Sequence, residues 1–198
     1  MPSPLAEKSI GLSRKAFALI GVCVLIAAAG VVFAIQPQAR PPSLIGGPFH
    51  LQNAEGKTVT EADFLGAPFL VYFGYTHCPD ICPTTLAQIS DVMKRLPDKP
   101  IKAVFITVDP ERDTPKLMGD YVSSFDPRIV GLSGTPEEIA AAEKVYRVYA
   151  RKAPNKDGDY AMDHSSIIYL MDAKGAFVEP FDLERTPDEA AAELKKYF

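Results

Sequence analysis

The sequence predicts an α/β domain, in which a mixed β-sheet is covered by helices on both faces. Two continuous apolar runs, at 69–75 and 101–108, are typical of strands that are buried on both sides. Segments with helical periodicity alternate with such runs along the chain. This alternation, closed by a late hairpin, is the pattern of a mixed sheet with helices on both faces.

An N-terminal β-hairpin opens the predicted domain. Two short strand-like segments, 49–52 and 57–59, flank the turn-forming residues 53–56. Thr60 can then cap a short helix that extends to Leu65.

The next segment predicts two buried strands joined by a long helix. The strand at 69–75 comes first, and the helix is expected from about Pro83 to Leu96 because its apolar residues recur at helical spacing. The strand at 101–108 follows and ends at Asp109.

Three later helices share one start signal. A threonine followed by proline occurs at 114–115, 135–136 and 186–187, which supplies an N-cap hydroxyl and a proline at the first helical position. Glu138 and Glu189 complete a capping box at the second and third of these sites.

The sequence marks the remaining strands less clearly. Residues 129–132 predict a third strand, and 167–171 with 176–178 predict the late hairpin. The polar stretch from Arg151 to Tyr160 is expected to form a mobile loop.

The first forty residues differ in kind from the rest. Residues 17–35 form an uncharged apolar stretch, and nineteen residues at ~1.5 Å each span roughly 28 Å, about the thickness of a bilayer core. We therefore expect a single transmembrane helix. The alternative, a cleaved signal peptide, usually has a shorter apolar core and a small-residue cleavage site.

Basic residues precede this stretch, so the positive-inside rule predicts a short cytoplasmic N-terminus at 1–16. Residues 36–47, rich in proline and glycine, are the expected linker, and 48–198 are the expected functional domain. This places the domain in the periplasm, outside the cytoplasmic membrane. Its length suffices for one core and not for two.

The domain is acidic. Removing Glu7, Lys8, Arg14, Lys15 and Arg40 from the totals leaves 17 basic and 24 acidic residues, a net charge near −7. Basic runs are absent from the sequence, so nucleic-acid binding is not expected.

Two cysteines form the most informative motif. Cys78 and Cys82 lie four residues apart, just after the apolar strand at 69–75 and at the expected helix start. This spacing predicts that both sulfurs face the same way, and the helix N-terminus is expected to favour their thiolates. The pair can form a disulfide or bind a soft metal. Cys23, in the apolar stretch, is expected to be a plain hydrophobe.

A histidine can complete a metal site. His164 directly precedes the strand at 167–171, and two thiolates with one imidazole suit Cu(I) first and Zn(II) next. A closed structural zinc site nearly always has four protein ligands, which disfavours that alternative. His77 is a weaker candidate that could tune the Cys78 thiol or help to bind the metal, although adjacent residues rarely both reach one ion. His50 is expected to be an ordinary residue.

Several carboxylates have two interpretations. Asp163 either orients the imidazole of His164 or caps a turn. Asp80 is either a partner contact or a plain charge at a helix start, and 109–113 either support the site or form a solvated turn.

The cysteines fall at the carboxyl end of a central strand, where open α/β sheets place their sites. That is the layout of a thioredoxin-like fold. Together with the motifs at 73–83, 108–115 and 163–166, it resembles the Sco/SenC family of membrane-anchored copper proteins.

The resemblance implies one copper ion per domain, as Cu(I) or Cu(II), bound by Cys78, Cys82 and His164. It also implies a copper chaperone for the dinuclear copper centre of cytochrome c oxidase subunit II. The implied partners are that subunit in its apo form, a periplasmic copper donor and a thiol reductant.

The main alternative is an enzyme. A thiol–disulfide reductase would use Cys78 and Cys82 as catalytic residues to keep the cysteines of the oxidase reduced, and it would not need His164. The four-residue spacing differs from the closer pair of common dithiol oxidoreductases and favours metal binding. A peroxidase is the third and weakest interpretation, because its usual motif is not visible.

Overall fold

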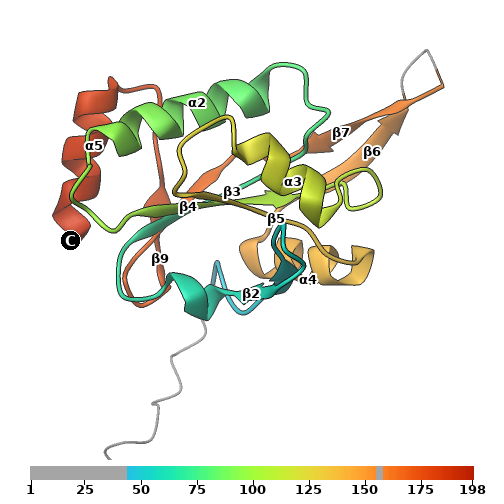
Figure 1. Ribbon diagram of the computed structural model, residues 1–198, viewed down its shortest axis with the longest axis horizontal. Coiled ribbons are helices and arrows are strands. Elements are labelled where there is room, and N and C mark those ends of the chain that lie inside the picture. The colour runs from blue at the N-terminus through green and yellow to red at the C-terminus, as the bar shows by residue number, and fades with distance from the viewer. Residues whose placement is uncertain (1–43, 155–157) are drawn as a thin grey trace, which may run out of the picture. The chain divides into compact units, whose positions relative to one another are not determined.

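The computed structural model describes residues 44–154 and 158–198, and these belong to one compact unit (Figure 1). No helix within those two ranges is long and apolar enough to cross a bilayer. The predicted transmembrane helix at 17–35 and the cytoplasmic segment at 1–16 lie outside the described residues, as does most of the predicted linker.

A five-stranded mixed sheet forms the centre of the domain. Its strands are listed here in spatial order: β5 (Ile129–Leu132), β4 (Lys102–Thr107), β3 (Phe69–Gly74), β8 (Ile168–Met171) and β9 (Phe177–Pro180). The pairs β3–β4 and β4–β5 are parallel, and the pairs β3–β8 and β8–β9 are antiparallel. The predicted mixed sheet is therefore confirmed.

The two long apolar runs form the central pair of strands. All six residues of β3 are buried, and in β4 only Lys102 is exposed. Strands covered on both faces need apolar residues at consecutive positions, which explains why these runs do not alternate.

Helices cover both faces of the sheet. Figure 1 shows α2 (Ile81–Lys94) and α5 (Pro187–Leu194) on one face and α4 (Pro136–Tyr146) on the other, and α2 packs against α5. The remaining helix, α3 (Pro115–Val122), packs against β5.

The predicted threonine caps are present. The side chains of Thr114, Thr135 and Thr186 each accept a hydrogen bond from a backbone N–H three residues later, and each is followed by proline. Glu138 and Glu189 complete the two predicted capping boxes. These helix starts were therefore predicted correctly.

The N-terminal hairpin is confirmed as β1 (His50–Gln52) and β2 (Thr58–Thr60). The helix after it is the short 3-10 helix η1 (Glu61–Phe64), which Thr60 and Asp63 cap reciprocally. A second 3-10 turn, η2 (Lys195–Tyr197), ends the domain.

The loop prediction for 151–160 is wrong for 151–154 and for Tyr160, which lie in strands, while 155–157 lie outside the described residues. β6 (Ala150–Pro154) and β7 (Tyr160–His164) pair antiparallel as a hairpin that forms a separate two-stranded sheet. Neither strand contains a fully buried residue, so the sequence lacks the apolar pattern that marks a strand. His164 is the last residue of this hairpin and not part of a loop.

Candidate metal centre

The turn before α2 brings the two thiols together. α2 begins at Ile81 and not at Pro83, so Cys78 lies outside the helix and Cys82 is its second residue. The prediction that both sulfurs lie on one helical face is therefore wrong in its geometry. The backbone N–H of Cys82 instead donates to Cys78 Sγ at 3.3 Å, and Cys78 N–H donates to Tyr75 O at 3.3 Å.

Cys78 Sγ thus takes the place of a capping side chain at the start of α2. The first amides of a helix have no partner within it and donate readily to a negative or polarisable group. Asp80, at the N-cap position, makes no such bond with its side chain and is exposed, which fits both predicted roles, a partner contact and a plain charge at a helix start.

Cys82 is held inside the core. Its side chain is fully buried, and its sulfur accepts a hydrogen bond from the hydroxyl of Tyr72 at 3.7 Å. Burial raises the pKa of the Cys82 thiol to about 12. The expectation that the helix N-terminus favours a thiolate is therefore wrong for Cys82, because loss of hydration outweighs the nearby amides.

Gly74 makes room for this sulfur. It is the last residue of β3, and a Cβ atom placed there would lie 2.8 Å from Cys82 Sγ and 2.7 Å from the ring of Phe105. Any other residue at this position would displace the thiol or the ring.

His164 faces the buried thiol. Its Nε2 lies 3.9 Å from Cys82 Sγ, and its Nδ1 lies 2.9 Å from the carbonyl oxygen of Ser165. Since a carbonyl oxygen only accepts, Nδ1 carries a proton, and in the neutral imidazole the lone pair is then on Nε2, which faces the sulfur. This is the tautomer that a metal ligand needs.

Two of the three predicted ligands, Cys82 and His164, lie within reach of one ion, and the sulfur of the third, Cys78, lies 3.3 Å from the backbone N of Cys82. Within the described residues, no three His, Cys, Asp or Glu side chains are near enough to enclose a metal, and both thiols are free. With metal–ligand bonds of ~2.0–2.3 Å, two ligand atoms on one ion lie roughly 3.5–4 Å apart. The separation of Cys82 Sγ and His164 Nε2 fits this, and the donor set suits copper.

The segment 109–113 supports the thiol turn and is not a solvated turn. Asp113 is fully buried, and its carboxylate accepts from the N–H and the hydroxyl of Thr76 and from the hydroxyl of Thr107. It thereby fixes the backbone two residues before Cys78.

The remaining candidates lie at the edge. His77 is half exposed, with Nδ1 at 3.1 Å from Thr76 Oγ1 and 3.8 Å from Asp113 Oδ1. Asp163 pairs with Arg151 at 3.5 Å, so neither predicted role for it is seen, and the carbonyl of Ser165 orients the imidazole instead.

The sequence interpretation missed Tyr72 and Gly74. A glycine inside a buried strand signals the close approach of another group, and that signal was available in the sequence. The tyrosine gave no signal, because aromatic residues are ordinary in buried strands.

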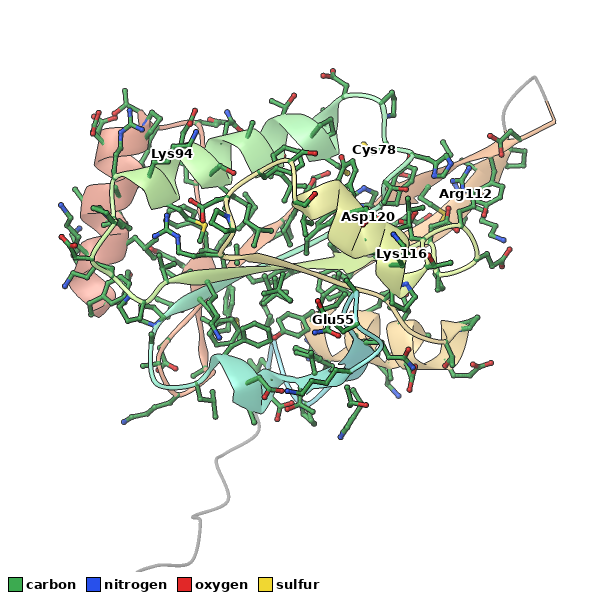
Figure 2. The ribbon with its side chains drawn as sticks, in the orientation of Figure 1. Glu55, Cys78, Lys94, Arg112, Lys116 and Asp120 are labelled. Carbon is green, nitrogen blue, oxygen red and sulfur yellow. The ribbon has the colours of Figure 1, made fainter. Side chains whose placement is uncertain are left out.

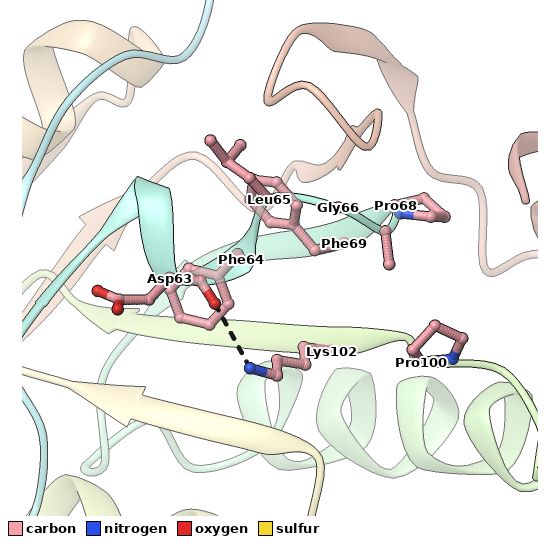
Figure 3. Close-up of a pocket in the computed structure, with 9 residues that line it drawn as sticks. Asp63, Phe64, Leu65, Gly66, Pro68, Phe69, Pro100 and Lys102 are labelled. Carbon is pink, nitrogen blue, oxygen red and sulfur yellow. Dashed lines mark hydrogen bonds between the residues drawn. The ribbon is translucent and has the colours of Figure 1, made fainter.

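A hollow elsewhere in the domain is not the metal centre. The hollow in Figure 3 is lined by residues around η1 and the first residues of β3 and β4, including Phe69 and Lys102. The thiols lie at the other end of β3, after Gly74. The hollow contains neither cysteine nor histidine.

A family model for SCO1/SenC proteins matches residues 37–198. The chain belongs to the SCO1/SenC family. Bradyrhizobium japonicum ScoI with copper bound is 58% identical, with a TM-score of 0.73 over 78% of this chain and 99% of that chain.

Two further SCO1/SenC relatives are more distant. BsSco, a member of the Sco family of cytochrome c oxidase assembly proteins with an identified disulfide switch, is 27% identical, with a TM-score of 0.62 over 81% of this chain and 98% of that chain. The mitochondrial protein SCO2 homolog of Danio rerio is 42% identical over 81% of this chain and 59% of its own length. The chain spans about half the length of other curated relatives, such as 52% of the human SCO1 homolog.

Proposed function

We propose that this protein is a copper chaperone. Cys78, Cys82 and His164 hold one copper ion, as Cu(I) or Cu(II), for delivery to the dinuclear copper centre of cytochrome c oxidase subunit II. The observation that carries the proposal is that His164 Nε2 faces Cys82 Sγ at 3.9 Å while Nδ1 lies against the carbonyl oxygen of Ser165. Copper binding in a Cys2His site needs this imidazole, whereas thiol–disulfide exchange needs only the two thiols.

Membership of the SCO1/SenC family supports copper as the bound metal. The 58% identical ScoI binds copper, and its similarity covers nearly the whole of that protein. The two sulfurs suit Cu(I), while the added imidazole suits Cu(II), which prefers nitrogen beside sulfur. Delivery to the oxidase rests on BsSco being a member of a family of oxidase assembly proteins.

Anaerobic copper titration of the reduced full-length protein in detergent tests the proposal. We expect one equivalent to bind in either oxidation state. His164→Ala should weaken Cu(II) binding by at least about 100-fold, and Cu(I) binding much less, because two thiolates alone make a serviceable Cu(I) site. His77→Ala, which removes the exposed neighbouring imidazole, is the matched control and should bind like the parent. Equal Cu(II) affinity in both variants would refute the proposed ligand set.

A thiol–disulfide reductase is the second candidate. Cys78 is partly exposed and Cys82 is buried, an asymmetry typical of an attacking and a resolving thiol. The Cys78 thiolate would attack a target disulfide and release one target thiol, and Cys82 would then release the second as the Cys78–Cys82 disulfide forms. An external thiol reductant would return the pair to its reduced form.

Separate assays of the two activities decide between these candidates. If the protein is a chaperone, His164→Ala should no longer transfer copper to an apo subunit II fragment. The variant should still reduce the disulfide of that fragment. If the variant supports full oxidase assembly without added copper, the reductase function takes the place of the chaperone.

We place the protein at the cytoplasmic membrane, anchored by 17–35, with its N-terminus cytoplasmic and its domain periplasmic. The uncharged stretch and the basic residues before it support this. Intact mass of the purified protein is the test. A mature chain that begins at or after Gln36 and carries no lipid would contradict the anchor.

A further inference from the structure

The hairpin that carries His164 needs an external attachment. β6 and β7 pair only with each other, and a lone two-stranded hairpin is marginally stable in water. Figure 1 shows this hairpin extending away from the central sheet. The position of His164 relative to the thiols therefore depends on what fixes β7 to the body of the domain.

Arg112 contacts the first residue of β7 in two ways. Its Nη1 donates to the carbonyl oxygen of Tyr160 at 3.0 Å and to Asp159 Oδ1 at 3.3 Å. Its guanidinium carbon also lies 3.8 Å from the centroid of the Tyr160 ring. Figure 2 labels Arg112 beside the hairpin, and Tyr160, which Arg112 contacts, pairs with Pro154 at the turn end of the two strands.

Asp109 closes a triangle with these two residues. Its carboxylate is buried, and it accepts from Nε of Arg112 and from the hydroxyl of Tyr160, the latter at 2.9 Å. Only 17% of the Arg112 side chain is exposed. Asp109, Arg112 and Tyr160 are together called the arginine clasp below.

The clasp is connected to both halves of the metal centre. The guanidinium carbon of Arg112 lies 5.8 Å from the ring of Tyr75, and the edge-on pair of Tyr75 and His164 has a centroid separation of 5.8 Å. The carbonyl oxygen of Tyr75 also accepts the N–H of Cys78. In the same segment as Arg112, Asp113 fixes the thiol turn through Thr76.

We propose that Arg112 is a positioning residue for His164. The arginine clasp holds β7 against the thiol turn and so sets the distance between His164 Nε2 and Cys82 Sγ. The inference rests on the proposed copper binding through His164. A planar guanidinium can stack on a ring and donate several bonds in fixed directions, which a lysine ammonium cannot do.

Arg112→Lys tests this inference because it keeps the charge and removes the planar fork. We expect Cu(II) affinity to fall by about 10- to 100-fold, the usual cost of losing a group that orients a metal ligand. The sulfur-to-copper absorption of the Cu(II) form should shift, while Cu(I) affinity and disulfide reduction stay at parent values. Lys152→Gln is the matched control, because Lys152 lies 4.6 Å from the same ring but pairs with Glu111 on the surface.

Hydrogen exchange of the copper-free protein gives a second readout. Amides of β7 should exchange faster in Arg112→Lys than in the parent, with those of α2 and β3 unchanged. Because this arm needs no metal, it separates failure of the clasp from failure of the copper proposal. A failed copper proposal would appear as His164→Ala binding Cu(II) normally.

Tyr160→Phe keeps the ring and loses only the hydroxyl bond to Asp109, so it should give a smaller change of the same kind. It also keeps the inference testable if Arg112→Lys fails to fold. Parent Cu(II) affinity and parent β7 exchange in the variants would overturn the inference. Equal loss of Cu(I) and Cu(II) binding with faster exchange throughout the domain would also overturn it, since that marks a general structural role.

Discussion

The two sides of the candidate metal centre are held by different physical means. The thiol side is part of the core, since Cys82 is fully buried between Gly74 and Tyr72, in a site shaped by apolar packing. The histidine side is a hairpin without a buried residue, and polar contacts and aromatic rings hold it. Packing gives one tight arrangement, whereas a hairpin without a buried residue can open at lower cost. The thiols are therefore the fixed half of the site and His164 the adjustable half.

The largest expected effect is on the fixed half. Cys82→Ser should abolish binding of both Cu(I) and Cu(II) and disulfide formation, because each needs the pair of sulfurs. Isothermal titration and thiol counting measure this. Cys23→Ser is the control and should behave like the parent. If Cys82→Ser still bound copper with His164 as a ligand, the thiols would not be the essential half of the site.

The buried thiol also predicts a dependence of stability on pH. Because burial raises the pKa of Cys82 to about 12, the folded state keeps this proton where the unfolded state loses it. The contribution is fully present below pH ~9 and is lost as the pH rises toward ~12, up to about 4 kcal/mol in the free energy of unfolding. Urea denaturation of the reduced protein at pH 8 and 10.5 measures it. In Cys82→Ser the free energy of unfolding should fall less between these two pH values. An equal fall in both proteins would mean that other groups cause the pH dependence.

Gly74→Ala tests how tightly the fixed half is packed. The added Cβ atom overlaps with Cys82 Sγ and Phe105, and overpacking a core typically costs about 1–3 kcal/mol. We expect a lower melting temperature and weaker Cu(I) binding together, measured by calorimetry and chelator competition. Unchanged stability would mean that the sulfur moves aside easily, and the thiol side would then not be the fixed half of the site.

The smallest expected effect is at an exposed ion pair of the hairpin, next to His164 in the strand pairing. Arg151→Ala removes an ion pair with Asp163 in which both side chains are more than half exposed. Exposed pairs contribute about 0–1 kcal/mol, so stability and Cu(II) affinity should remain close to parent values. A fall as large as that expected for Arg112→Lys would mean that the whole hairpin surface, and not the clasp, positions His164.

The same contrast explains what could be predicted from sequence. The central strands and threonine caps carry strong local signals, because β3 is apolar throughout and Thr135 with Glu138 forms a complete capping box. The hairpin could not be predicted, since its strands lack an apolar face and its attachment comes from Arg112, distant in sequence.

The start of α2 was misplaced for a related reason. Proline usually marks the first helical position, yet Pro83 is the third residue of the helix. No residue of the first turn needs its N–H for an internal bond, so proline fits there equally well. The Cys78 sulfur accepts the amide of Cys82 instead, a contact that spacing alone does not reveal.

The unequal exposure of the two thiols has a consequence for release of a bound ion. An incoming thiol from a partner reaches the centre from the side of Cys78 and His164, because Cys82 is enclosed by the core. For copper held as proposed, ligands would therefore be exchanged one at a time, with Cys82 the last to leave. The rate of copper transfer would then rise with the concentration of the partner. It would not be limited by spontaneous dissociation of copper from this protein. Free copper would not appear in solution at any step.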